Sequence, residues 1–244
     1  MVTAPSSGQR GFGIVTTDLL GYDGYSSGDC TSDFGGTSSA APAVAGAIGV
    51  LLGARPELTR RQVLHLLATT SKQPPTTLGS DWTLRNAQGV SHSHEYGWGL
   101  VDLTALVSAN PPALGPEQRF TTGKISVNSA LPDGTGQGFT RQFTVSSPGI
   151  VEYVEVKIWL SHSRRGDMAI SLTDGHGVIS MLAQPHADDH SGYHPTNGWT
   201  FGSARHWGQQ QAGGAGSWTL SVADAVRNSK SGNLVAFEVV IYSH

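Results

Sequence analysis

The sequence contains little charge and a single cysteine. Only 14% of its 244 residues are charged, and 15 Lys and Arg against 18 Asp and Glu give a net charge of −3. This balance excludes the broad positive surface that phosphate backbones require, so we expect no nucleic acid partner. The one cysteine, Cys30, cannot form a disulfide within the chain. It favours either a reducing compartment or a partner outside the chain.

Long hydrophobic runs are also absent. No stretch approaches 18 consecutive apolar residues, the length that a membrane-spanning helix needs. The first residues, MVTAPSSGQRGFG, have neither the basic lead nor the apolar run of a signal peptide. We therefore expect no membrane segment in this chain, and we find no targeting signal in it.

Glycine and proline are abundant, with 32 and 12 residues, and they indicate many turns. In the second half, apolar residues alternate with polar ones in VEVKIWL at 154–160, and again at 168–172, 218–222 and 235–241. Alternation with a period of two is typical of half-buried strands. Turn signals separate these runs, so we expect residues 118–244 to form an antiparallel, jelly-roll-like β-sandwich.

The first half has a helical pattern instead. Small and apolar residues dominate 40–54, and a second apolar run, VLHLLA, begins at Val63. Thr59 and Gln62 have the spacing of a capping box at the start of this second helix. The prolines of NPPALGP at 110–116 exclude both helix and central strand. We therefore divide the chain into residues 1–110, a linker at 111–117, and residues 118–244.

The motif that carries chemistry is GTSSAAP, from Gly36 to Pro42. It places Ser38 at the N-terminus of the first helix, where the positive end of the helix dipole would stabilise a developing oxyanion. Gly35 and Gly36 allow a substrate backbone to approach closely. Taken from capping chemistry alone, the same residues also fit an ordinary capped helix, because Ser and Thr begin many helices.

The whole heptapeptide resembles the nucleophile motif of the subtilisin-like serine proteases, and the likeness continues through the two helices that follow. In the second half, HSRRGDMAISL at 162–172 and WTFGSARHWGQ at 199–209 resemble the P domain of kexin and furin-type proprotein convertases. Met168 replaces the usual Leu and Gln209 the usual Glu. The resemblance implies the last, α/β part of a subtilisin-like catalytic domain in residues 1–110 and an all-β P domain in 118–244.

The resemblance also implies the function and the site. It predicts a serine endopeptidase of the secretory pathway, in the Golgi or secreted, that processes proproteins after paired basic residues. Ser38 would be the nucleophile, and the Thr37 hydroxyl would support the oxyanion. The polypeptide substrate and the missing N-terminal part of the catalytic domain would be its partners. Calcium is expected from the family, with its sites mostly upstream; no residue of this chain is assigned to a metal or cofactor.

A serine nucleophile needs a base and an acid, and the subtilisin order places both before the serine. No histidine precedes Ser38, and the first one, His65, is expected to be solvated on the polar face of its helix. The serine-first order of the α/β-hydrolases requires G-x-S-x-G, whereas Ser38 is followed by Ser39 and Ala40. We therefore expect both partners to lie before Met1 and this chain alone to be inactive.

Three alternatives remain open. The chain could be a non-enzymatic product whose β-sandwich serves as a folding or binding module. Cys30 lies eight residues before Ser38, where furin-type enzymes carry a cysteine bonded to an upstream cysteine, but a free buried thiol also fits. A metal cluster can be drawn through His186, Asp188, His190 and His194. A solvated loop is favoured there, because this spacing fits no common zinc site.

Overall fold

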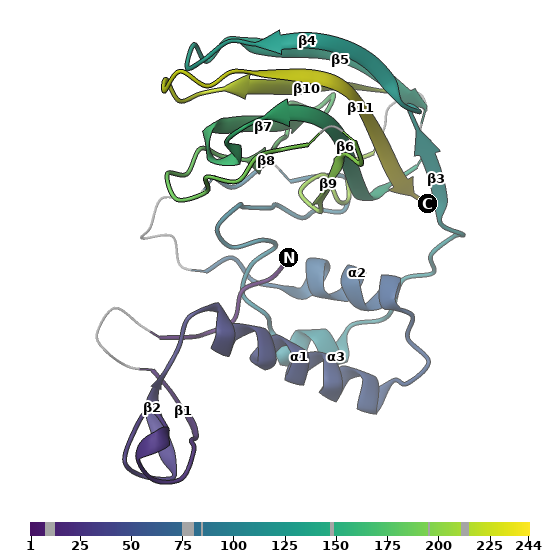
Figure 1. The fold of residues 1–244 in the computed structure, drawn as a ribbon. Coiled ribbons are helices and arrows are strands. Elements are labelled where there is room, and N and C mark those ends of the chain that lie inside the picture. The colour runs from purple at the N-terminus through teal and green to yellow at the C-terminus, as the bar shows by residue number, and fades with distance from the viewer. Residues whose placement is uncertain (8–12, 75–80, 84, 147–148, 195, 211–214) are drawn as a thin grey trace. The chain divides into compact units, whose positions relative to one another are not determined.

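The computed structural model describes residues 1–7, 13–74, 81–83, 85–146, 149–194, 196–210 and 215–244. The chain divides into two compact units (Figure 1). The first comprises Met1–Arg85 and Gly89–Leu114, and the second Asn86–Gln88 and Gly115–His244. Each unit has its own hydrophobic core, and each is described by itself.

The first unit contains a β-hairpin and three helices. Strands β1 (Ile14–Thr17) and β2 (Cys30–Phe34) pair antiparallel, and the short 3-10 helix η1 (Gly21–Asp23) lies between them. The two strands lie close together in sequence and pair with each other. The helices are α1 (Thr37–Ala54), α2 (Arg60–Thr70) and α3 (Leu103–Ser108).

The helices meet around a small leucine core. Leu51 of α1, Leu66 of α2 and Leu106 of α3 are each at most 1% exposed. The predicted capping box begins α2: the Thr59 side chain accepts from the Gln62 N–H, and the Gln62 side chain accepts from the Thr59 N–H. Both contacts satisfy amides that a helix start leaves without intrahelical partners.

Helix α1 is apolar but poorly covered. Of its 18 residues only Ser39, Ala47 and Leu51 are buried. With 18 residues and a mean hydropathy of 1.5, the helix is long and apolar enough to cross a membrane by length and composition alone. Only 17% of its residues are buried. The sequence predicts this helix but no membrane span, because glycines and serines interrupt its apolar run.

The second unit is a sandwich of two antiparallel sheets. In one, β5 (Gly138–Ser146), β10 (Ala215–Asp224), β7 (Met168–Thr173) and β8 (Ile179–Ala183) follow in that order. In the other, β3 (Gln118–Thr121), β11 (Gly232–Ser243), β6 (Val151–His162) and β9 (Trp199–Ser203) follow in order, and β4 (Ile125–Leu131) also pairs with β11. The predicted β-sandwich is confirmed.

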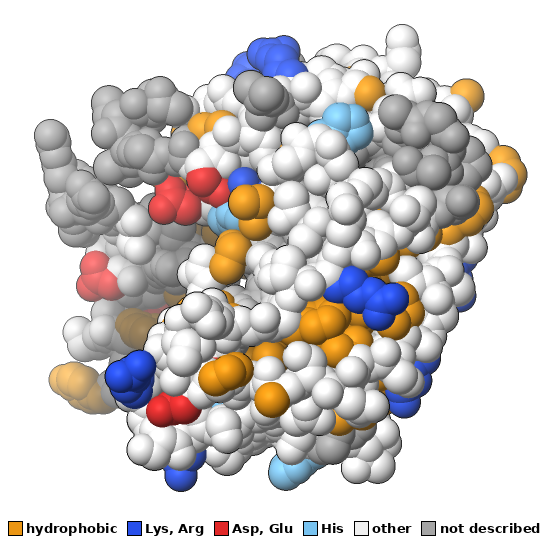
Figure 2. All heavy atoms as spheres, turned by 90° about the horizontal axis from the view of Figure 1, so that it is seen from above, with side chains coloured by type: hydrophobic (Ala, Val, Ile, Leu, Met, Phe, Trp, Pro, Cys, Tyr) orange, Lys and Arg blue, Asp and Glu red, His pale blue; other side chains and the backbone are white. Residues whose placement is uncertain are grey.

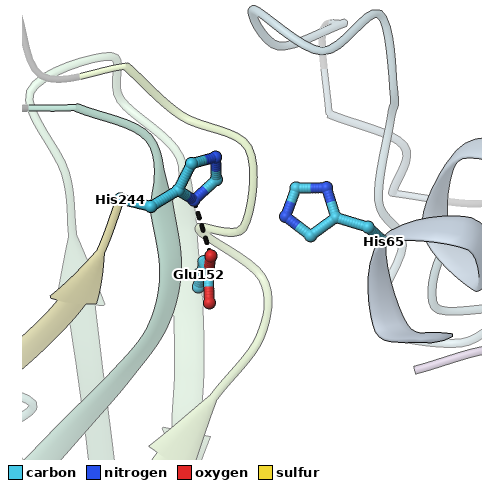
Figure 3. A group of neighbouring side chains, drawn as sticks. All are labelled: His65, Glu152 and His244. Atoms are coloured by element: carbon cyan, nitrogen blue, oxygen red, sulfur yellow. Dashed lines mark ion pairs between the residues drawn. The ribbon is translucent and has the colours of Figure 1, made fainter. Parts of the chain in front are cut away.

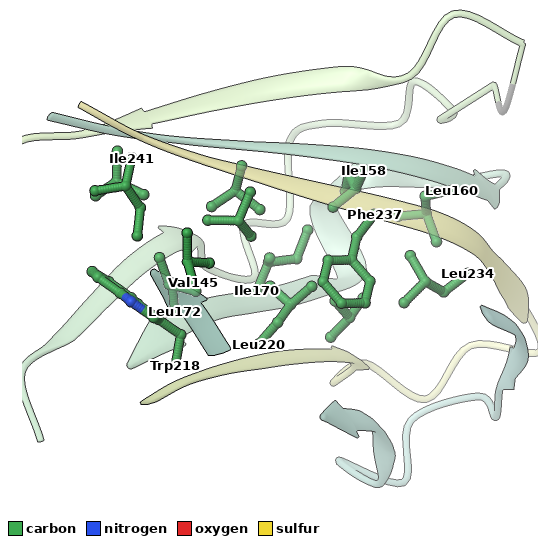
Figure 4. Close-up of a cluster of buried hydrophobic side chains, with 14 of the residues drawn as sticks. Val145, Ile158, Leu160, Ile170, Leu172, Trp218, Leu220, Leu234, Phe237 and Ile241 are labelled. Atoms are coloured by element: carbon green, nitrogen blue, oxygen red, sulfur yellow. The ribbon is translucent and has the colours of Figure 1, made fainter. Parts of the chain in front are cut away.

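The inner faces of the two sheets enclose the main core, as Figure 4 shows. Burial alternates along β7 with the predicted period of two. Phe237 of β11 is fully buried, and its ring centroid lies 6.0 Å from Phe139 and 5.4 Å from Phe143 of the facing sheet. Burying a side chain of this kind contributes roughly 1.5–3 kcal/mol.

Charged side chains are sparse on the surface as well. Figure 2 shows one face of the molecule, on which Lys, Arg, Asp and Glu lie singly or in small groups among uncharged atoms. This distribution matches the charged fraction of 14%. Four of the chain's charged or titratable groups are instead paired deep inside the sandwich.

Two histidine–aspartate pairs are buried in the second unit. His206 Nδ1 lies 3.1 Å from Asp174 Oδ2, and His162 Nε2 lies 3.1 Å from Asp224 Oδ2, with all four side chains 0% exposed. A third histidine, His244, pairs through Nδ1 with Glu152 at 2.5 Å (Figure 3). Buried groups of this type are stable only when their hydrogen-bonding capacity is met.

Asp174 shows how such a pair is held. Burial opposes ionisation of its carboxyl, but hydrogen bonds from His206 and from the N–H groups of Val178 and His176 outweigh burial and keep the pKa of Asp174 below 3.8. The carboxylate thus both closes the turn between β7 and β8 and orients the His206 ring. That ring in turn meets Trp218 edge-on at 4.9 Å.

We expect Asp174→Asn to lower the free energy of unfolding by about 3–5 kcal/mol at pH 7, because one amide hydrogen would face the His206 N–H. The folded pKa is lowered, so the stabilisation is fully present above about pH 3.8 and is lost as the pH falls through the folded pKa. The difference in the free energy of unfolding between wild type and variant, measured by urea titration, should therefore decrease below pH 3.8. The exposed Asp188→Asn serves as the control, and a gap that widens on acidification would contradict the assignment.

We also expect the two units to differ in stability. Amides of β6, β10 and β11 should exchange with deuterium at least about 100-fold more slowly than those of α1, because these strands contribute many fully buried residues to the main core whereas α1 buries three residues. Hydrogen exchange of the intact chain, followed by peptide mass spectrometry, measures this directly. Equal protection in α1 and β11 would show that α1 is as well packed as the sandwich.

Candidate functional site

Two glycines bring the chain from strand β2 into helix α1. Strand β2 ends at Phe34, and Gly36 has φ 69° and ψ −166° before the helix begins at Thr37. This positive φ belongs to a region that glycine adopts without strain. A Cβ on Gly35 would lie 2.5 Å from the Ser7 Oγ, so the neighbouring segment also approaches closely. The motif glycines therefore set the geometry of the turn that presents the serines.

The two serines of the motif have different environments. Ser39 is 5% exposed, donates to the Gly36 carbonyl at 3.1 Å and lies 2.6 Å from the Ser6 Oγ. Ser6 also donates to the Gly36 carbonyl at 2.7 Å, and Ser7 accepts from the Gly36 N–H at 3.3 Å. Ser38, by contrast, is exposed in the first turn of α1. Of the two hydroxyls, only that of Ser38 is presented to solvent.

The backbone around Ser38 is also suited to an anion. Thr37 and Ser38 occupy the first turn of the helix, where N–H groups have no intrahelical acceptor and the dipole is positive. Pro42 is the sixth helical residue, and it removes the N–H that would otherwise bond to the Ser38 carbonyl.

A base for Ser38 is lacking among the described residues. No histidine or carboxylate in the described part of the chain forms a hydrogen bond with the Ser38 hydroxyl. His65, expected to be solvated, is only 4% exposed, so that expectation is wrong. It belongs to a run of four buried positions in α2, from His65 to Ala68. The serine motif thus stands without its base.

A second serine, histidine and aspartate come together near residue 93, but in the wrong order. Ser93 donates to Asp81 Oδ1 at 2.8 Å, and His94 Nδ1 lies 2.5 Å from Asp81 Oδ2. A catalytic histidine stands between the serine and the acid, whereas here the acid stands between the other two. Ser93 is also 0% exposed. The arrangement is therefore not that of a catalytic triad.

The described carboxylates offer no calcium cage. Within the second unit, His162, Asp167 and Asp224 bring ligand atoms within 4.8 Å of one another. The Asp224 carboxylate already contacts His162 and the Val226 N–H. The Asp167 carboxylate contacts Asn228 and, at 3.3 Å, Arg164 Nε. The third ligand atom of the group would be a histidine nitrogen. Calcium takes six to eight oxygen ligands, so this set does not fit it.

The segment from His186 to His194 does not form the alternative metal cluster. His186, Asp188, His190 and His194 are exposed, and none belongs to a group that could hold an ion in the described part of the unit. The Arg-Gly-Asp tripeptide nearby forms a 3-10 turn, η2 (Arg165–Asp167), in which Asp167 is 1% exposed. The four side chains at 186–194 are thus exposed, and the tripeptide is a turn with a buried aspartate.

Cys30 opens strand β2 and is exposed with a free thiol. The alternative of a free buried thiol is therefore wrong in one respect, because the side chain is accessible. Its place at the exposed end of the hairpin rather than in a core follows from the hairpin itself, in which β1 and β2 have only each other as neighbours.

Comparisons with known proteins agree with this arrangement. Residues 3–99 match the family model "Subtilase family", and residues 151–241 match "Proprotein convertase P-domain". The chain is 33% identical to furin-1 of Xenopus laevis over 99% of its own length and 30% of that protein. It is 36% identical to proprotein convertase subtilisin/kexin type 6 of Rattus norvegicus over 94% of the chain and 24% of that protein.

Solved structures show the same fold. The serine protease of Aeromonas sobria, in complex with its chaperone, has a TM-score of 0.78 and 23% identity, over 96% of this chain and 51% of that one. The chain thus spans 24–30% of these curated convertases and about half of the bacterial protease. Taken with the serine motif at the start of α1 and the β-sandwich that follows, these matches show that the chain belongs to the subtilisin-like proteases with a P domain, the kexin and furin type.

Proposed function

We propose that this chain contributes the nucleophile segment and the P domain of a serine endopeptidase. The observation that carries the proposal is the contrast between the two motif serines: Ser39 is buried and ties the turn, whereas Ser38 is exposed at the positive end of α1. In this proposal residues 1–110 are the end of the peptidase domain, 111–117 are a linker, and 118–244 are the P domain.

The chemistry assigned to this chain is nucleophilic attack and oxyanion support. The Ser38 Oγ would attack the scissile carbonyl of a polypeptide while a histidine takes its proton, and the Ser38 N–H would donate to the oxyanion, with support from the Thr37 hydroxyl. The histidine and its aspartate would come from a part of the catalytic domain outside this sequence. That requirement makes the chain alone inactive.

We expect a fluorophosphonate probe to leave the purified chain unlabelled, because a serine without its base loses most of its reactivity; in subtilisin, the loss is roughly 10⁶-fold in turnover. Labelling is measured by intact-mass spectrometry, with a complete subtilisin as the positive control. Ser38→Ala and Ser39→Ala identify any site that does react. Labelling of Ser38 at the rate of a complete protease would overturn the claim that the chain is inactive alone.

The substrate class follows from the family to which the chain belongs. We infer that the complete enzyme processes secretory precursors after paired basic residues, that it requires calcium held mostly outside this chain, and that it acts in the secretory pathway. The exposed thiol of Cys30 would pair with a cysteine of the same missing part. Acidic pockets select Arg and Lys through charge-assisted hydrogen bonds, which gives such enzymes their preference.

We expect the longer protein that this proposal requires, assayed with calcium, to cleave peptides after Lys-Arg at least about 100-fold faster than after Phe or Leu. Only the basic side chains can form charge-assisted hydrogen bonds with acidic pockets. The measurement is kcat/KM on matched fluorogenic peptides, with Ser38→Ala as the inactive control. Equal rates on the apolar peptides would assign it to the broad-specificity subtilisins.

One observation favours a second candidate, a non-enzymatic module. The sandwich has a complete core of its own, with Trp218 and Phe237 fully buried, and needs no residue of the first unit for it. A binding or folding role for residues 118–244 would be compatible with an inert Ser38. The same fluorophosphonate labelling, carried out on the longer protein in place of this chain, separates the two candidates, because Ser38 reacts only in the enzyme.

A further inference from the structure

The second unit has a groove where two edge strands separate. Strands β8 and β9 are the outer strands of the two sheets, and the groove between them has a volume of about 600 Å³. A volume of this size is typical of sites for small molecules. We propose that this groove binds a neutral sugar, a role independent of the chemistry at Ser38.

The register of the strands explains why the groove opens. Trp199, Phe201 and Ser203 of β9 pair with residues of β6 that face the core, so all three lie on the inner face of their sheet. At Ser203 the sandwich is closed, because its hydroxyl lies 2.7 Å from that of Ser180 on β8. Exposure then rises from 7% at Ser203 to 48% at Trp199. The two edges therefore diverge toward Trp199.

An aromatic corner forms one wall of the groove. Trp199 and Tyr193 meet edge to face, with centroids 6.4 Å apart and planes at 72°. Both line the groove together with the half-buried Phe201. An exposed tryptophan on the core side of a strand is otherwise costly, since its apolar surface faces water. A flat apolar ligand surface would cover it.

A neutral polar pair stands beside these rings. The Arg165 guanidinium lies 5.5 Å from the Trp199 ring centroid and 6.0 Å from that of Tyr193. Its Nε is 3.2 Å from Asp189 Oδ2. A hydrogen bond from the Ser191 N–H and the nearby Arg165 hold the pKa of Asp189 below its usual value, although burial opposes this. The carboxylate is thus ionised and cancels the charge of the arginine.

This combination selects a sugar over an ion. A cation would meet the Arg165 guanidinium already placed against the rings, and an anion would meet the Asp189 carboxylate. Neighbouring hydroxyls on a sugar are each donor and acceptor, so they match an adjacent carboxylate and guanidinium. The C–H face of the same sugar ring can cover Trp199. Gln184 and His186, which also line the groove, add further polar contacts.

An added peptide strand suits the groove less well. The edge strands β8 and β9 have five residues each, which gives a short row of backbone partners. Pro185, two residues after the end of β8, removes one backbone donor on that side.

The test uses the intact chain. Calorimetric titration with cellobiose, lactose and mannobiose probes free neutral sugars, and a biosensor comparison of ribonuclease B with ribonuclease A probes a neutral glycan on a protein, since the two ribonucleases differ in that glycan. We expect saturable binding to at least one free sugar or to ribonuclease B alone. Trp199→Ala and Asp189→Asn should each weaken that binding by about tenfold or more.

Tyr153→Ala is the matched control, because this aromatic residue is 39% exposed on the outer face of the same sheet. It should leave binding within about twofold, since it makes no contact with the groove. Far-ultraviolet circular dichroism confirms that each variant is folded. Three outcomes would overturn the proposal: no saturable binding to any of these probes, equal binding to ribonucleases A and B with no free sugar bound, or sugar binding that survives Trp199→Ala and Asp189→Asn.

Discussion

The sandwich depends on the pairing of β11 with three other strands. Along one edge β11 pairs with β6 from Gly232 to Ser243, and along the other with β4 and then β3. Phe237 lies near the middle of this strand and packs against two phenylalanines of the opposite sheet. Because β11 is the last strand of the chain, the sheet that contains β6 gains its central member only when residues 232–243 are in place. Long-range pairing of this kind closes late and cooperatively.

The first unit depends on a more local constraint. The turn at Gly36 is held from both sides, since Ser7 accepts from its N–H and Ser6 donates to its carbonyl. Ser39 adds a second bond to the same carbonyl. These contacts fix where α1 begins, and hence which serine is exposed. The assignment of a nucleophile therefore depends on a hydrogen-bond network of residues that take no part in the chemistry themselves.

Sequence patterns predicted the elements that depend on neighbouring residues and missed the contacts between residues far apart in sequence. The period of two located β6, β7, β10 and β11, and the capping residues located α2, because both signals depend on neighbours in sequence. Strand β9 has no such signal, since Trp199 and Thr200 are exposed and Gly202 interrupts it. The buried His206–Asp174 pair joins positions 32 residues apart. Nothing in either residue's neighbourhood indicates its partner, and the same is true of Ser6 and Ser39.

The adjacent glycines before α1 are required for different physical reasons. At Gly35 a side chain would collide with Ser7, so the position selects against size. At Gly36 a Cβ would meet no atom within 4 Å, and only the positive φ excludes other residues. At Gly36 the backbone conformation, and not the size of a side chain, therefore excludes other L-residues. A D-alanine at Gly36 would adopt the same backbone angles without strain and would restrict the unfolded chain, whereas an L-alanine at Gly35 would force Ser7 to move.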